Sequence, residues 1–239
     1  MGRAYAVREA KIKKTGAARG KIYTNFAKEI YLVAKNGVPE IEANSQLKHL
    51  VEKAKKMQVP ADIINRALSK AKGAGKDEYE VIMYEGFGPG ASTFIIRTLT
   101  DNVNRTVGEV RAAFNKVHKS LGVNGSVSYN YENLSVMAFK SDKEEEILMA
   151  LLDAGIEPSE CETDSEGMLN ISVNYTDNVK TKEIIESIVP NVDFDVDESG
   201  WYAKDMITLE GEDLEIFNRL YDLLDDVDDV TDIYHNVEL

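Results

Sequence analysis

The sequence predicts an α+β protein of three domains: a basic N-terminal three-helix domain, a discontinuous α/β middle domain and an inserted ferredoxin-like βαββαβ domain. The apolar residues follow a helical period up to residue 72 and then alternate between strand and helix periods. The charge changes sign near the same place. Residues 1–76 hold seventeen Lys and Arg against six Asp and Glu, whereas residues 77–239 hold eleven against thirty-six. A chain of 239 residues is also long for one hydrophobic core.

The expected boundaries are 1–76 for the basic domain, 77–132 with 204–239 for the middle domain, and 133–203 for the ferredoxin-like domain. The first twenty residues are basic and contain almost no large apolar side chain, which predicts a mobile arm. Apolar stripes then predict three helices, over 21–36, 45–57 and 60–72. Pro60 suits the first turn of the third helix, and Gly73 suits its end.

The middle domain begins with expected strands at 79–83 and 93–99, which flank a loop at 85–90. A helix follows, and the spacing of Thr106 and Glu109 is that of a capping box at its start. A strand at 206–209, a helix over 214–224 and a strand at 230–234 end the chain. Because the strands before residue 132 lack partners of their own, we expect them to pair with this last segment.

Residues 134–196 give the order of the ferredoxin-like unit. The expected elements are a strand at 134–139, a helix at 143–154, strands at 158–162 and 168–174, a helix at 179–189 and a strand at 192–196. The pattern therefore predicts an insertion that folds around its own core.

Several classes of protein are excluded or disfavoured. No apolar run approaches the roughly 20 residues that span a bilayer, and no secretory signal is present, so we expect a cytoplasmic protein with no membrane partner. A single cysteine, Cys161, rules out an internal disulfide and a multi-thiolate zinc site. No nucleophile–base pair and no metal motif is evident, so we expect no catalysis, no metal and no cofactor.

Two segments imitate ligand sites. The glycines at 86–90 are not followed by the Gly-Lys-Ser/Thr of a phosphate loop, so a tight structural turn is expected. The aspartates at 222–229 lack the glycine and the distant glutamate of a calcium-binding loop. Solvated charge is the expectation for them, with a protein contact or weakly bound Mg²⁺ as the alternative.

The basic end predicts contact with a phosphate backbone. The expected contacts are the cationic residues Arg3, Arg8, Lys11, Lys13, Lys14, Arg19, Lys21, Lys28, Lys48, Lys53, Lys55, Lys56, Arg66, Lys70 and Lys72. Arg97, Arg105 and Arg111 either extend this surface or form structural ion pairs. Core or rim packing is expected for Tyr23 and Tyr31, rather than stacking on bases.

Six ordered blocks resemble one family. They are RGKIYT at 19–24, KAK at 53–55 leading to VP at 59–60, YEGFGP at 84–89, LTDNVNRT at 99–106, GSV at 125–127 and DDVTDIY at 228–234. Together they are similar to the YebC/PmpR family over essentially the whole chain. The opening Arg3-Ala4-Tyr5 departs from the commoner pattern and looks most like the family's second branch. The resemblance implies a three-domain cytoplasmic protein, helical first and α/β after.

The resemblance implies a DNA-binding transcriptional regulator, because members of the family commonly carry that label. Other relatives, one of them mitochondrial, look like translation factors that help ribosomes through proline runs. We therefore expect a monomeric, non-catalytic regulator that binds DNA or, in the alternative, ribosomal RNA on the ribosome. The basic helices are rich in lysine, and lysine contacts with phosphate position a protein on nucleic acid without reading the base sequence. The third hypothesis is an adaptor whose ferredoxin-like unit binds protein, with the basic end secondary. The acidic surface is a further possible site for a protein partner.

Overall fold

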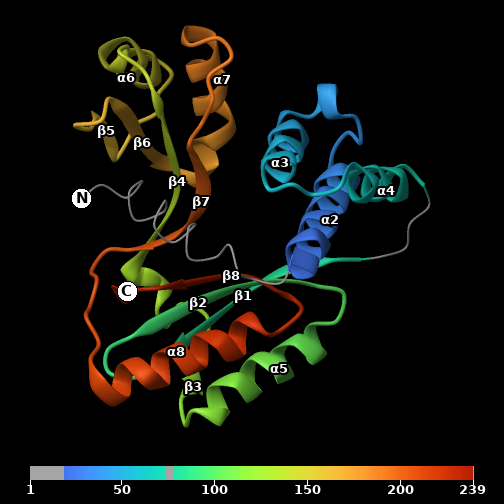
Figure 1. Ribbon diagram of the computed structural model, residues 1–239, viewed down its shortest axis with the longest axis vertical. Coiled ribbons are helices and arrows are strands. Elements are labelled where there is room, and N and C mark those ends of the chain that lie inside the picture. The colour runs from blue at the N-terminus through green and yellow to red at the C-terminus, as the bar shows by residue number, and fades with distance from the viewer. Residues whose placement is uncertain (1–18, 74–77, 239) are drawn as a thin grey trace. The chain divides into compact units, whose positions relative to one another are not determined.

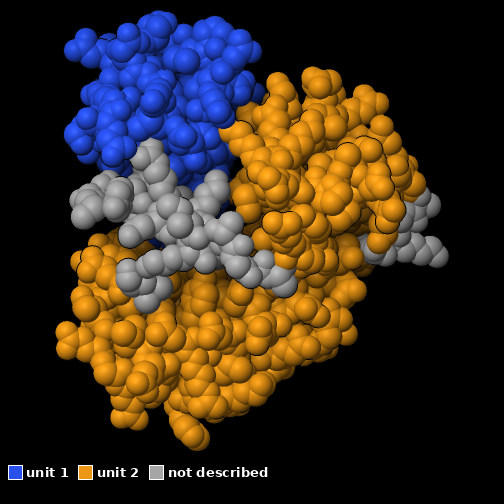
Figure 2. Space-filling model, in the orientation of Figure 1, with its two compact units in different colours: residues 1–16, 132–202 blue, residues 17–131, 203–239 orange. Residues whose placement is uncertain are grey.

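A computed structural model describes residues 19–73 and 78–238 (Figure 1). The expected N-terminal arm and most of the segment that joins the basic helices to the first strand lie outside these residues. The described residues form two compact units, a smaller one over 132–202 and a larger one over 19–73, 78–131 and 203–238 (Figure 2). The fold is α+β, as predicted, and it contains two four-stranded sheets. The separation of the larger unit into a helical and an α/β domain stays a prediction.

The basic N-terminal half of the larger unit is a helical segment, residues 19–73. It contains α2 (Arg19–Asn36), α3 (Ser45–Lys56) and α4 (Ala61–Lys72), which agree with the three expected helices. Asn44 caps α3, because its side-chain oxygen accepts a hydrogen bond from the Leu47 amide at 3.1 Å. Pro60 stands at the N-cap of α4 rather than in its first turn. A core that includes Ile30, Tyr31 and Val51 holds the three helices together.

The rest of the larger unit is built on a sheet with the strand order β3-β1-β2-β8. The strands are β1 (Glu80–Phe87), β2 (Thr93–Thr100), β3 (Ser120–Leu121) and β8 (Val230–His235). β2 pairs with β8 in antiparallel register, with Ile96 opposite Ile233, so the predicted pairing of distant segments is confirmed. Two expectations were wrong here. Residues 85–87 continue β1, and of residues 206–209 only Ile207 forms a bridge, to Val237.

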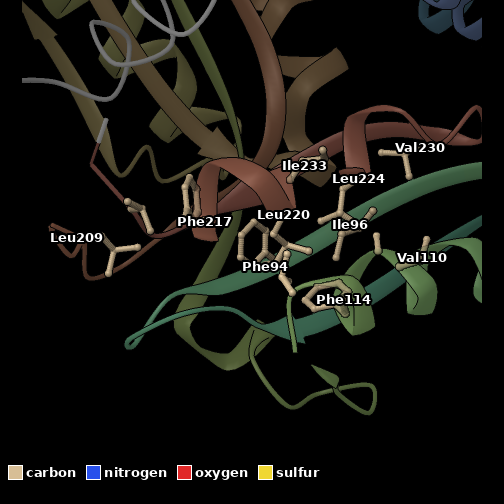
Figure 3. Packing of buried hydrophobic residues seen from close by; sticks show 13 residues of the cluster. Phe94, Ile96, Val110, Phe114, Leu209, Phe217, Leu220, Leu224, Val230 and Ile233 are labelled. Atoms are coloured by element: carbon tan, nitrogen blue, oxygen red, sulfur yellow. The ribbon is translucent and has the colours of Figure 1, made fainter. Parts of the chain in front are cut away.

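α5 (Val103–Lys116) and α8 (Gly211–Asp225) pack on one face of this sheet (Figures 1 and 3). Phe94 of β2 lies at the centre, 5.2 Å from the stacked ring of Phe217 and 6.0 Å from the edge-on ring of Phe114. A Cβ atom on Gly86 would come within 2.3 Å of the Phe114 ring, so β1 needs glycine there. The long-range pairing of β2 with β8 therefore encloses an aromatic core.

The start of α5 differs from the sequence prediction. Asn102 is the cap, because its side chain accepts a hydrogen bond from the Arg105 amide at 3.1 Å. The capping box of Thr106 and Glu109 was wrong, because Thr106 lies one turn inside the helix and is buried. The Thr106 hydroxyl instead reaches the carboxylate of Asp229, 2.8 Å away. A residue expected to cap the start of the helix thus belongs to a buried polar network.

The smaller unit has the ferredoxin-like topology, with the strand order β5-β6-β4-β7. Its elements are β4 (Tyr131–Lys140), α6 (Glu144–Asp153), β5 (Glu160–Thr163), β6 (Met168–Asn174), α7 (Asn178–Ile188) and β7 (Val196–Ala203). The last strand begins where the expected one ended. Phe194 packs edge-on against Phe139 at 5.3 Å, so the expected strand at 192–196 is mostly a packed connection that precedes the sheet.

A buried carboxylate anchors the loop over residues 122–130 in the larger unit. Glu85, on β1, accepts hydrogen bonds from the amides of Gly125 at 2.8 Å, Val127 at 2.6 Å and Ser128 at 3.0 Å. Burial alone would raise the pKa of Glu85, but these amide donors outweigh it and lower the pKa. Three amides of the loop thus share one carboxylate of β1, so Glu85 fixes the conformation of the loop.

Replacing Glu85 with glutamine is expected to destabilise the protein by about 2 kcal/mol, because a neutral amide cannot satisfy three backbone donors as a carboxylate does. Urea unfolding measures the difference, and amide hydrogen exchange should quicken at Gly125, Val127 and Ser128. Glu80→Gln, at an exposed position of the same strand, is the matched control. Equal stability and equal exchange in E85Q and the wild type would contradict the anchoring role.

Candidate nucleic-acid interface

The structure describes ten of the fifteen residues that the sequence assigns to phosphate contact. Arg3, Arg8, Lys11, Lys13 and Lys14 lie outside the described residues. Six of the ten have exposed side chains: Arg19, Lys55, Lys56, Arg66, Lys70 and Lys72. The other four, Lys21, Lys28, Lys48 and Lys53, are half-buried. Phosphate contact by any of them stays a prediction.

The exposed cations gather on α3 and α4. Lys55 and Lys56 stand in the last turn of α3, and Lys70 and Lys72 in the last turn of α4. Lysine near a helix C-terminus is favoured by the helix dipole, which accounts for part of this placement. The helical segment nevertheless carries eleven Lys and Arg against five Asp and Glu. The excess of six positive charges creates a local field that attracts polyanions.

Tyr31 positions two of the ammonium groups near the end of α2. The Nζ atoms of Lys35 and Lys70 lie 5.4 and 5.5 Å from the centre of its ring, within the range of cation–π contact. The ring itself is buried and meets Tyr79 edge-on at 5.8 Å, so the core packing expected for Tyr31 is confirmed. Lys35 was not among the predicted contacts, although its seven-residue spacing from Lys28 places it on the same stripe of α2.

Lys21 and Lys28 of α2 contact the end of α8, the end of β2 and the residue before β8. Lys21 donates to the backbone carbonyl of Asp225, and its ammonium group lies 3.6 Å from the Asp225 carboxylate. Burial lowers the pKa of Lys21 and outweighs the attraction of Asp225. Lys28 donates to Asp229 at 3.0 Å and to the Leu99 carbonyl at 3.3 Å. Because both amines are half-buried and lie against the carboxylates of Asp225 and Asp229, we leave them out of the proposed interface.

Asp229 is the centre of the network that joins α2 to the sheet. It is only 3% exposed, and its carboxylate accepts hydrogen bonds from Lys28, Arg105, Thr100 and Thr106 at 2.6–3.1 Å. Burial alone would raise its pKa, but the bonds from Arg105, Lys28 and Thr106 outweigh it and lower the pKa to about 2. The expectation of solvated charge at 222–229 was therefore wrong for Asp229.

Two of the three arginines proposed as a secondary surface form ion pairs. Arg97 contacts Glu29 of α2 at 2.6 Å and Asp232 of β8 at 3.2 Å. Burial alone would lower the pKa of Arg97, but these two carboxylates raise it instead. Arg105 contacts Asp101 at 2.9 Å and Asp229 at 2.6 Å. Arg111 is exposed on α5, so contact between Arg111 and phosphate stays a prediction.

The described part of the chain offers no site for a metal. Among residues 19–73 and 78–238, no three His, Cys, Asp or Glu side chains gather in a group that could hold a metal ion. Within the same residues, no helix has the length and apolar character needed to cross a membrane. The arrangement that remains is a set of exposed ammonium and guanidinium groups on three packed helices, which can bind phosphate without a chemical step.

Comparison with known proteins covers the chain from end to end. A family model described as the TACO1/YebC protein N-terminal domain matches residues 3–74, and one described as the TACO1/YebC second and third domain matches residues 79–237. The chain is 41% identical to a probable transcriptional regulatory protein of Chromohalobacter salexigens, over 100% of this chain and 99% of the relative. It is 42% identical to one of Vibrio parahaemolyticus, over the full length of both.

A solved structure is also similar. The crystal structure of a conserved hypothetical protein from Aquifex aeolicus matches with a TM-score of 0.73 and 28% sequence identity, over 93% of this chain and 91% of that one. The similarity thus extends through both compact units, so it supports the whole described fold rather than one part of it.

Proposed function

Because the chain belongs to the TACO1/YebC family, we propose that it is a non-catalytic regulator of gene expression that binds nucleic acid through the exposed cations of α3 and α4. The observation that carries the proposal is the charge of the helical segment, an excess of six positive charges in a protein whose net charge is −14. A polyanion is attracted by that local field and repelled by the acidic remainder of the chain.

Transcription is the process that the names of the relatives favour, since both relatives cited above are called probable transcriptional regulatory proteins. We therefore propose DNA as the first candidate ligand. RNA on the ribosome is the second candidate. It is favoured by the lysine-rich composition of the exposed cations, because lysine binds phosphate as a point charge and reads no base edge. Structured RNA is commonly recognised by backbone and shape.

Sedimentation of a cell lysate through a sucrose gradient tests the proposal. Co-migration with ribosomes that nuclease or high salt abolishes would support translation, because counterions compete with phosphate contacts. A position at the top of the gradient, with discrete promoter fragments recovered after crosslinking, would support transcription. Recovery of neither DNA nor RNA with the protein at low salt would contradict nucleic-acid binding altogether.

A further inference from the structure

The larger unit carries a second unusual surface, far along the chain from the α3–α4 cations. Three apolar side chains are exposed around the loop over 122–130: Phe87 is 43% exposed, Val123 is 77% and Tyr129 is 66%. We call these residues the aromatic loop surface. Single exposed apolar residues are common, but two aromatic rings and a valine at one loop require a separate explanation.

Phe87 and Tyr129 are both linked through the backbone to Glu85. Phe87 lies two residues after Glu85 on the same face of β1, and Tyr129 follows Ser128, whose amide donates to Glu85. The Gly122 amide donates to the Glu85 carbonyl at 2.7 Å. A Cβ atom on Gly122 would come within 3.2 Å of the Phe87 ring, so the loop lies directly against Phe87. Glu85 therefore fixes the backbone from which both rings project.

The segment that leads into and forms this loop differs in charge from the rest of the acidic body. Residues 110–131 contain no Asp or Glu, although residues 77–239 contain thirty-six. The same segment carries Arg111, Lys116 and Lys119. Lys204 adds a further ammonium group, because its Nζ donates to the Tyr129 carbonyl at 3.0 Å. The exposed Tyr129 thus lies beside the ammonium group of Lys204, in a segment that contains three further cations and no Asp or Glu.

Exposed rings beside cations match the chemistry of an unpaired nucleic-acid strand. Bases that have left a duplex stack on aromatic rings, while lysine and arginine follow the phosphates. An apolar protein segment would use the rings but not the cations, and a duplex would use the cations but not the rings. We propose that the aromatic loop surface binds unpaired nucleotides, with Phe87 and Tyr129 as stacking platforms. This proposal rests on the proposed function and adds the class of ligand that the middle of the chain recognises.

The test compares strands that have bases with strands that lack them. Full-length protein is titrated by fluorescence anisotropy with a short unstructured DNA strand, the same sequence as RNA, and an abasic strand of equal length. The wild type should bind both base-containing strands more tightly than the abasic strand. The double variant Phe87→Ala/Tyr129→Ala should lose this preference, because each lost stack weakens binding by roughly 5- to 150-fold. If the wild type binds the RNA and DNA strands with different affinities, the tighter one identifies the kind of nucleic acid that the surface recognises.

Three further variants control the result. Tyr129→Ala alone, at the most exposed ring, should reduce the preference in part without disturbing the fold. Tyr175→Ala, whose ring is 46% exposed in the smaller unit, should leave it unchanged. Lys116→Gln/Lys119→Gln should weaken binding to all three strands by a similar factor, because phosphates are common to them.

The outcomes separate this inference from the proposed function. If Phe87→Ala/Tyr129→Ala is folded by circular dichroism and keeps the full preference for bases, the surface does not stack on nucleotides and belongs to a protein contact instead. If the wild type binds the base-containing and abasic strands equally, the inference also fails, while binding through α3 and α4 still stands. If the wild type binds no strand and no duplex at any salt concentration, the proposed function fails first.

Discussion

Replacing Lys55, Lys56, Lys70 and Lys72 together with glutamine is expected to weaken binding to nucleic acid by at least about 100-fold. Each ammonium group that contacts a phosphate releases a condensed counterion, and the neutral side chain releases none. Glutamine has nearly the helix propensity of lysine, so α3 and α4 should keep their structure. The affinity for a DNA duplex and for an RNA hairpin, measured by fluorescence anisotropy at one salt concentration, gives the loss directly.

The matched control for this variant is Lys140→Gln/Lys180→Gln, which removes two exposed lysines from the smaller unit. That unit holds eighteen Asp and Glu against four Lys, so its field should repel phosphate with or without these two charges. We expect the control to bind as the wild type does. If the quadruple variant also binds as the wild type does, the cations of α3 and α4 are solvated charge, and the interface has been assigned to the wrong residues.

Asp229→Asn is expected to destabilise the protein by about 3 kcal/mol at neutral pH, because removing one partner of a buried ion pair leaves Lys28 with an uncompensated charge. The neighbouring Asp228 is exposed, so Asp228→Asn should change the free energy of unfolding by less than about 0.5 kcal/mol. Urea unfolding of the two variants and the wild type measures both differences. Equal stability of D229N and the wild type would show that Asp229 does not hold α2 against the sheet.

The same carboxylate predicts a dependence on pH. Its pKa is about 2 in the folded protein, against an ordinary value of 3.8. A depressed pKa means that the stabilisation is present above pH 3.8 and is lost as the pH falls toward 2, and it amounts to about 2 kcal/mol. The gap in stability between the wild type and D229N should therefore narrow below about pH 4. A gap that stays constant down to pH 2 would contradict the charged form as the stabilising one.

The elements that the sequence predicts well are those whose signal is local. The stripe of Ile22, Phe26, Ile30 and Val33 defines α2 because a helix buries one face at a period of 3.6 residues. The ferredoxin-like order could be predicted because each of its strands and helices carries its own period. The pairing of β2 with β8 required only the argument that unpartnered strands must find partners.

The interface was harder to predict because burial of a charge depends on distant residues. Lys21, Lys28 and Lys35 lie on one stripe of α2, yet Lys28 meets Asp229 some 201 positions further along the chain, whereas Lys35 stays exposed. No local pattern distinguishes these lysines. The burial of Asp229 could not be predicted for the same reason, because the neighbouring aspartates have the same local sequence pattern. Its burial follows from the position next to β8, where the Leu99 amide donates to its carbonyl at 2.9 Å.

The residue that caps α5 was also hard to predict, because two nearby residues could act as the cap. Asn102 and Thr106 both have side chains that cap helices, and the sequence favoured Thr106 because Glu109 follows at the spacing of a capping box. The structure selects Asn102 because Thr106 bonds to Asp229, a tertiary contact that the local pattern does not contain. The functional consequence is that Arg105 falls inside the first turn, where Asp101 and Asp229 bind it.

If this acidic protein binds nucleic acid through one basic helical segment, its affinity must fall as the salt concentration rises. The salt dependence of binding is therefore the most direct test. The affinity of the full chain for a DNA duplex and an RNA hairpin is measured over a series of salt concentrations. Four or more phosphate contacts predict that log K falls against log salt with a slope of roughly −3 or steeper, and that the quadruple variant loses about three units of that slope. A flat dependence, or no binding at the lowest salt, would contradict the account.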